Sequence, residues 1–224
     1  MGSIDLSNNA LSNHIAEHIT NQIITGKLQP GEKLVENNYA EEYGTSRAPV
    51  REAIFTLTVE GLVERVPRRG AIVKEYTESE IYDLLEIRIM LESLAIKRIN
   101  ENGVDEEFLK EMEAILRKMQ DQKEAGQYAE MNHDFHMCII KMSKSDVIKK
   151  KYDHLKLPLL RIQSLSFAKE GNIPKSINDH AMIVQLLKEK EVMKAANALN
   201  QHNQDVISNI QNRLYKDNRA LQKF

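Results

Sequence analysis

The sequence predicts a mostly α-helical protein in which a small N-terminal domain with a β-hairpin precedes a larger all-helical domain. Apolar residues recur at helical spacing through most of the 224 residues. Six of the nine glycines and three of the five prolines fall within the first 76 residues. Because glycine and proline interrupt regular structure, we expect short elements there and long helices after Tyr76.

The composition excludes several classes of protein. A hydrophobic content of 42% and a charged content of 29% are typical of a soluble globular protein. No apolar run approaches a membrane span, and residues 1–9 lack the features of a signal peptide, so we expect a cytoplasmic protein without a membrane partner. The single cysteine, Cys138, excludes an intrachain disulfide. Since the net charge is −2, nucleic-acid binding would require a local basic patch.

The first part of the chain predicts two helices separated by a turn. A helix is expected over residues 11–25, where isoleucine or leucine recurs every fourth position. Residues 26–34 contain the Pro30-Gly31 dipeptide and are expected to form a turn. A short helix follows over 35–43, and Gly44 connects it tightly to the next helix. Two helices joined by such a connection make a helix-turn-helix.

The helix that begins in residues 45–53 carries the main candidate DNA contacts. Ser46 can cap it, and Pro49 is tolerated in its first turn. Arg47 and Arg51 are four residues apart and so share a face at the end where a DNA-reading helix meets base edges. Two solvated arginines without a partner are the alternative.

A hairpin is expected next, with short β-type runs at residues 62–63 and 71–73 on either side of a turn. A hairpin directly after a helix-turn-helix is a wing. Residues 47–74 carry six basic and three acidic side chains, a net charge of +3, whereas the whole chain is negative. The basic charge therefore lies on the two elements that would contact DNA, although a solvated hairpin remains the alternative.

These motifs resemble the winged-helix domain of GntR-type bacterial transcriptional regulators. The shared positions are Gly26, Leu28, Pro30, Gly31, the run 46–53, the run 60–62 and Gly70. The resemblance implies that Arg47 and Arg51 read the major groove and that Gly70 lets the wing approach the minor groove. One departure is Asn37, where some members carry an additional arginine. We expect a DNA-binding domain over residues 8–75, with candidate contacts at Ser46, Arg47, Pro49, Arg51, Arg68, Arg69 and Gly70.

A second domain of about six helices is expected over residues 77–218. Thr77 and Glu80 have the spacing of a capping box, which opens the first helix. The expected helices span 77–103, 105–123, 127–142, 145–169 with a kink at Pro158, 174–189 and 191–216.

Histidines in this domain suggest a metal site. Asn132 and His136 are one helical turn apart, and His180 and His202 lie in the last two helices. On spacing alone, each histidine is more often an ordinary core or surface residue than a metal ligand.

The helical half resembles the FCD-type effector domain of the FadR-like branch. Many members hold a divalent metal with an acidic residue, a histidine one turn later, and one histidine from each of the last two long helices. The resemblance implies Asn132, His136, His180 and His202 as ligands, with an amide in place of the usual acid. An amide oxygen brings no negative charge, so metal affinity should fall or the preferred metal change. We expect a divalent transition metal, with Zn or Ni favoured.

The resemblance also implies an effector site. Arg88 matches an arginine that in relatives helps to bind the effector, although an ion pair with Glu86, Glu92 or another helix is an equal alternative. Ser176 and Asn209 are weaker candidates for lining the same pocket. The implied ligand is a small organic acid or similar anion.

We therefore expect a metabolite-responsive repressor that binds a double-stranded operator as a homodimer. An architectural DNA-binding protein that ignores small molecules is the alternative. A metalloenzyme is disfavoured, because no Glu follows a candidate ligand as in His-Glu-x-x-His and the residues after His136 are Met137 and Cys138. No catalytic residue is expected.

Overall fold

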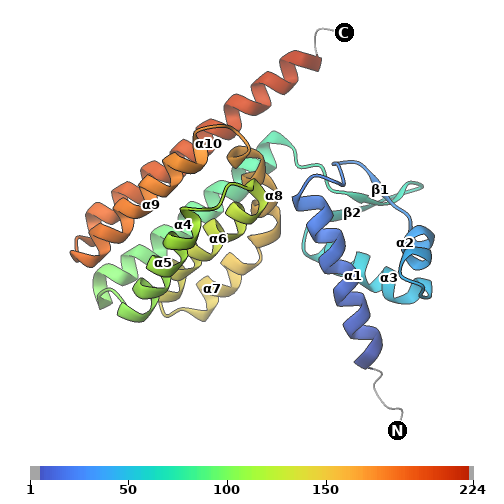
Figure 1. The fold of residues 1–224 in the computed structure, drawn as a ribbon, viewed down its shortest axis with the longest axis horizontal. Coiled ribbons are helices and arrows are strands. Elements are labelled where there is room, and N and C mark those ends of the chain that lie inside the picture. Colours follow the sequence, from blue (N-terminus) through green and yellow to red (C-terminus); the bar gives the residue numbers. More distant parts are fainter. Residues whose placement is uncertain (1–5, 222–224) are drawn as a thin grey trace. The chain divides into compact units, whose positions relative to one another are not determined.

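The computed structural model describes the backbone of residues 6–221 and the side chains of residues 10–211. The chain divides into two compact units that meet in sequence at Tyr76 and Thr77 (Figure 1). The predicted absence of a signal peptide concerns residues 1–9, of which residues 1–5 lie outside this description. No helix in the described part is long and apolar enough to cross a membrane.

The N-terminal unit contains three helices and three short strands among its described residues: α1 (Leu6–Ile24), β1 (Lys33–Leu34), α2 (Glu36–Glu42), α3 (Arg47–Val59), β2 (Val63–Val66) and β3 (Gly70–Val73). Helix α3 packs against α1. The contact is apolar, because Ile15, Ile19 and Ile23 of α1 are buried, as are Val50 and Ile54 of α3. This packing leaves the opposite face of α3 exposed.

The wing contains one more strand than the expected hairpin. The strand order is β1-β3-β2, and both pairings are antiparallel. Residues 26–34 were expected to form only a turn, but their last two residues pair with β3 at Ile72 and Ala71. Two residues are too short for the alternation that identifies a strand in a sequence.

The C-terminal unit consists of seven helices within the described residues: α4 (Glu78–Asn102), α5 (Glu106–Met119), α6 (Ala125–Met142), α7 (Asp146–Asp153), α8 (Lys156–Phe167), α9 (Asn172–Lys188) and α10 (Val192–Leu221). Helix α6 is the centre of the bundle, since twelve of its eighteen residues are buried. It contacts α4, α5, α7 and α8. The polar residues Asn132, His133 and His136 of α6 are therefore enclosed by neighbouring helices.

The expected helix over 145–169 with a kink at Pro158 is instead two helices. Helix α7 ends at Asp153 and α8 begins at Lys156. Pro158 is the third residue of α8, where its missing N–H would have no intrahelical acceptor. The proline therefore starts a helix rather than bending one. The capping box at the start of α4 is present, with Glu80 N donating to Thr77 Oγ1 over 3.2 Å.

Candidate DNA interface and metal centre

The start of α3 places its basic residues in solvent. Ser46 occupies the N-cap position, although its side chain makes no capping hydrogen bond. Pro49 is buried in the first turn. The side chains of Arg47 and Arg51 are 59% and 54% exposed. The helix thus presents two guanidinium groups on its accessible face.

Glu36 of α2 holds both arginines, a contact that sequence reasoning missed. Arg51 Nε and Nη2 lie 3.4 and 3.2 Å from the two carboxylate oxygens of Glu36. Arg47 Nε lies 3.8 Å from Glu36 Oε2. The hydrogen bond to Glu36 and its negative charge raise the pKa of Arg51. Nothing in the spacing indicates this pairing, because Glu36 belongs to a different helix.

The wing tip has the backbone of a tight turn. Arg68 has a φ of 65° and Gly70 a φ of 87°. Positive φ suits glycine and is uncommon for arginine. Arg68 and Arg69 are exposed between β2 and β3, and Gly70, the first residue of β3, is exposed as well. Their contacts with DNA stay predictions.

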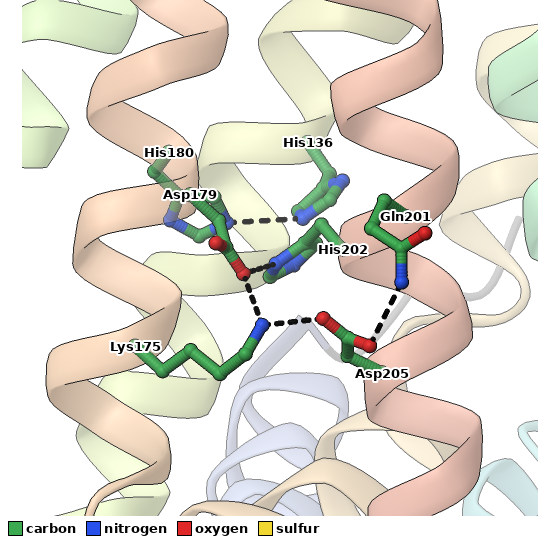
Figure 2. Close-up of polar contacts among 7 residues, drawn as sticks. All are labelled: His136, Lys175, Asp179, His180, Gln201, His202 and Asp205. Atoms are coloured by element: carbon green, nitrogen blue, oxygen red, sulfur yellow. Dashed lines mark hydrogen bonds and ion pairs between the residues drawn. The ribbon is translucent and has the colours of Figure 1, made fainter.

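Three histidines converge inside the C-terminal unit (Figure 2). His136 comes from α6, His180 from α9 and His202 from α10, and all three are buried. One ligand atom from each lies within 4.8 Å of the others. His136 Nε2 and His180 Nε2 are 3.3 Å apart. The structure therefore brings together the three histidines that the sequence singled out.

The geometry fits a divalent metal. Two nitrogens bound at about 2.0–2.1 Å to a tetrahedral ion lie roughly 3.3 Å apart, which matches the separation of His136 and His180. His202 Nδ1 lies 3.2 Å from Asp179 Oδ2, while His202 Nε2 is buried and has no hydrogen-bond partner among the described residues. The Asp179 contact leaves Nε2 as the donor atom that can bind a metal.

Protonation also favours metal binding. Burial, followed by the charge of Arg88, lowers the pKa of His136 to about 4. Burial, followed by the charges of His202 and His136, holds the pKa of His180 well below its usual value. Both imidazoles are neutral near pH 7, which is the form that binds metal ions.

Asn132 is buried one turn before His136. Its Nδ2 donates to Gln163 Oε1 of α8 over 3.0 Å. Its Oδ1 is buried and has no hydrogen-bond partner within the described part of the chain. The role of this amide oxygen as an uncharged ligand stays a prediction.

Glu92 of α4 contacts the histidine cluster and several other buried polar groups. Its Oε1 lies 2.8 Å from Arg88 Nε, 3.0 Å from His136 Nδ1 and 2.9 Å from the hydroxyl of Tyr152. Its Oε2 accepts a hydrogen bond of 2.7 Å from Asn203 Nδ2. Burial, the largest single effect, raises the pKa of Glu92, but the charge of Arg88 and the contacts with His136 together outweigh burial and hold this pKa well below its usual range. The buried carboxylate is ionised.

The sequence indicates Glu92 only as one possible ion-pair partner for Arg88. The structure shows that ion pair, with both side chains almost fully buried. The effector contact of Arg88 stays a prediction. Ser176 and Asn209 line a small cavity together with His202, so they lie at the histidine cluster, and their contact with an effector also stays a prediction.

Comparison with known proteins identifies the family. Residues 11–73 match the model of the gntR family of bacterial regulatory proteins, and residues 83–205 match the FCD domain. The chain belongs to the GntR family, in the branch with an FCD domain. It is accordingly a DNA-binding transcriptional regulator and not an enzyme. The predicted family and fold class are confirmed.

Two of the proteins similar to this GntR-family regulator are repressors. It is 27% identical over 200 residues to the gluconate operon transcriptional repressor of Bacillus subtilis, covering 86% of this chain and 82% of the relative. It is 23% identical over 186 residues to the transcriptional repressor RspR of Escherichia coli, covering 82% and 81%. The solved structure of E. coli McbR/YncC matches 96% of this chain and 100% of that chain with a TM-score of 0.74 at 23% identity, which shows a shared fold.

Proposed function

We propose that this regulator is a homodimeric repressor whose affinity for its operator is changed by a small organic acid bound at a divalent metal. The observation that carries this proposal is the buried cluster of His136, His180 and His202. Nδ1 of His136 faces the carboxylate of Glu92, and Nδ1 of His202 faces that of Asp179. Carboxylates in that position orient metal-binding histidines. The regulator would act in the cytoplasm, where it meets DNA.

His136, His180, His202 and the Oδ1 of Asn132 would hold the ion, with Zn or Ni favoured by the imidazole ligands. The ion would supply positive charge and open coordination positions for a carboxylate. The similarity to gluconate operon repressors supports a sugar acid or another hydroxy acid as the effector. Arg88, Ser176 and Asn209 are the proposed residues around this ligand.

The route from effector to DNA would run through α10 and α4. His202 and Asn203 are neighbours on α10, and Asn203 donates to Glu92 of α4. Helix α4 begins directly after the junction at Thr77. A ligand that moves α10 would therefore act on the element connected to the DNA-binding unit. It can shift DNA affinity only by binding two arrangements of these helices unequally.

A homodimer would use the exposed face of α4. Ile87, Met90 and Leu94 follow one another at spacings of three and four residues, and they are 45%, 65% and 49% exposed. Such spacing places them on one side of the helix, where exposed apolar side chains mark an interaction surface. A second copy of this chain would cover them and present a second α3 to the other half of a pseudo-palindromic operator.

Operator binding tests the function. An operator selected from random duplex DNA would be titrated with Zn-loaded full-length protein, with and without gluconate and other hydroxy acids, and followed by fluorescence anisotropy. We expect one acid to weaken binding by about tenfold, within the range usual for allosteric coupling. His202→Asn should bind the operator and ignore the acid, while His154→Asn, which alters an exposed histidine, should respond normally. Identical operator affinity with every acid would favour the architectural alternative.

A further inference from the structure

Lys175 of α9 lies at the solvent end of the polar contacts that lead to the histidine cluster (Figure 2). Its ammonium lies 3.1 Å from Asp179 Oδ2, and that oxygen lies 3.2 Å from His202 Nδ1. Lys175 also pairs with Asp205 of α10. The side chain of Lys175 is 49% exposed, whereas that of His202 is 2% exposed. The ammonium thus stands between solvent and a buried candidate ligand.

The cavity at this place is closed to an organic acid. Its volume is about 10 Å³, and its lining includes Lys175, Ser176, Asp179, His202 and Asp205. That volume is about the space for one water molecule. A carboxylate can reach His202 only if side chains of the lining move. Exposed ion pairs contribute little to stability, so the pairs of Lys175 are the contacts that separate most readily.

The two partners of Lys175 differ in how firmly they are held. Asp179 contacts the buried His202, which ties it to the histidine cluster. Apart from Lys175, Asp205 contacts Gln201, whose Nε2 donates to Asp205 Oδ1 over 3.0 Å on the exposed side of α10. An ammonium has three N–H donors, so Lys175 can keep Asp179 and still change its other partner. Asp205 is the partner that an incoming anion can replace.

We propose that Lys175 determines the specificity of the effector site for anions, by exchanging Asp205 for the carboxylate of the effector. This inference rests on the proposed function, because it assigns a residue to the binding of the proposed acid. Lys175 both closes the approach to His202 and supplies the charge that receives the ligand. An uncharged molecule of the same shape offers no replacement for Asp205 and leaves the ion pair intact.

Two substitutions separate this role from simple obstruction. Lys175→Met removes the ammonium and keeps a long apolar stem, whereas Asp205→Asn removes the competing carboxylate and keeps the ammonium. If Lys175 receives the anion, the first change weakens anion binding and the second strengthens it. If Lys175 only obstructs the cavity, both changes open the approach and both strengthen binding.

Acetate is the probe, titrated by calorimetry into Zn-loaded full-length protein at pH 7.5 in a buffer without carboxylates. Acetamide provides the uncharged comparison. Lys188→Met is the matched control, because Lys188 also lies on α9, is 51% exposed and pairs with Glu113 over 2.8 Å. We expect Lys175→Met to weaken acetate binding by about tenfold, Asp205→Asn to strengthen it a few-fold, and Lys188→Met to leave it unchanged. Thermal unfolding of each variant confirms that the fold is retained.

Unchanged or tighter acetate binding by Lys175→Met overturns the inference, as does equal binding of acetamide and acetate. Acetate binding that is absent from a Zn-loaded parent also overturns it and leaves the metal site standing. If the parent takes up no Zn, the metal part of the proposed function fails instead. The same titration is then made with metal-free protein. Weaker acetate binding by Lys175→Met than by the parent supports the role of Lys175. Equal binding by the two proteins, or no binding by the parent, refutes that role.

Discussion

Oε1 of Glu92 lies 3.0 Å from Nδ1 of His136. The buried carboxylate on α4 thus faces one ring nitrogen of His136, while the other, Nε2, lies near His180. Carboxylates in this position orient metal-binding histidines, so Glu92 would favour Nε2 of His136 as the donor to a metal. It also joins the proposed metal site to the helix that begins at the junction of the two units.

Replacing Glu92 by Gln should weaken Zn binding by about 10- to 100-fold, because the amide no longer orients and polarises His136. Competition with a chromophoric chelator measures the affinity. Tyr152→Phe removes only one hydrogen bond to Glu92 and should have a smaller effect. Equal Zn affinity in the parent and Glu92→Gln would contradict this role of the carboxylate.

Replacing Asn132 by Asp should strengthen Zn binding by roughly tenfold, since a carboxylate adds a negative charge beside the three imidazoles. The new side chain cannot donate to Gln163 Oε1, so the Gln163 amide is expected to turn and present its NH₂ group. Asn132→Leu is the comparison and should weaken binding. Zn affinities that do not differ among the three proteins would show that residue 132 is not a ligand.

Replacing Glu36 by Gln should reduce the discrimination between operator and random DNA. Glu36 holds Arg47 and Arg51 in place, and its loss removes both that support and a negative charge next to DNA. Binding to random duplex should become tighter. The difference in binding free energy between operator and random DNA should fall by about 1 kcal/mol, the low end of the range for a good base contact. Glu42→Gln removes the same charge from α2 without touching either arginine and serves as the control.

Metal-free protein should lose stability as the pH falls. Burial, followed by the charge of Arg88, lowers the pKa of His136 from 6.5 to about 4. Below pH 6.5 the imidazole of His136 binds a proton in the unfolded chain but stays neutral in the folded chain. The free energy of unfolding therefore falls with pH until the pH passes about 4. Between pH 7 and pH 5 this amounts to about 2 kcal/mol for His136. Urea unfolding in the presence of a chelator should show a smaller pH dependence for His136→Gln than for the parent.

Replacing Met90 by Glu should convert the proposed dimer to a monomer. A charge within the apolar stripe of α4 would have to be buried against the second copy, which is unfavourable without a partner. Sedimentation gives the oligomeric state at several concentrations. Val147→Glu alters a side chain of α7 that is also exposed, at 70%, and should leave the oligomer unchanged. A Met90→Glu variant that stays dimeric would place the dimer contact elsewhere, and a monomeric parent at micromolar concentration would exclude the dimer.

Sequence periodicity predicted the long helices well, because each needs a continuous apolar face that is visible in a single stretch of chain. It failed where the decisive contact is distant. Leu34 belongs to a strand only because it pairs with Ala71 of β3. The sequence predicts a kink at Pro158, but the position of this residue in the first turn of α8 depends on where α7 ends.

The three histidines were identified from the sequence, because a resemblance to a family supplied the spacing. Their convergence is confirmed, while their role as ligands stays a prediction. The contacts of Glu92 could not be predicted in the same way. Its partners come from α6, α7 and α10 as well as from α4, and no local pattern indicates which of several acidic residues becomes enclosed.

The uncharged ligand set has a consequence for what the regulator would sense. Three neutral imidazoles and the amide of Asn132 would leave both positive charges of a divalent ion uncompensated by direct ligands. An anion bound beside the ion would neutralise part of that charge, so metal and acid would each strengthen the binding of the other by the same factor. The protein would then report the coincidence of two inputs, the supply of an organic acid and the supply of a transition metal.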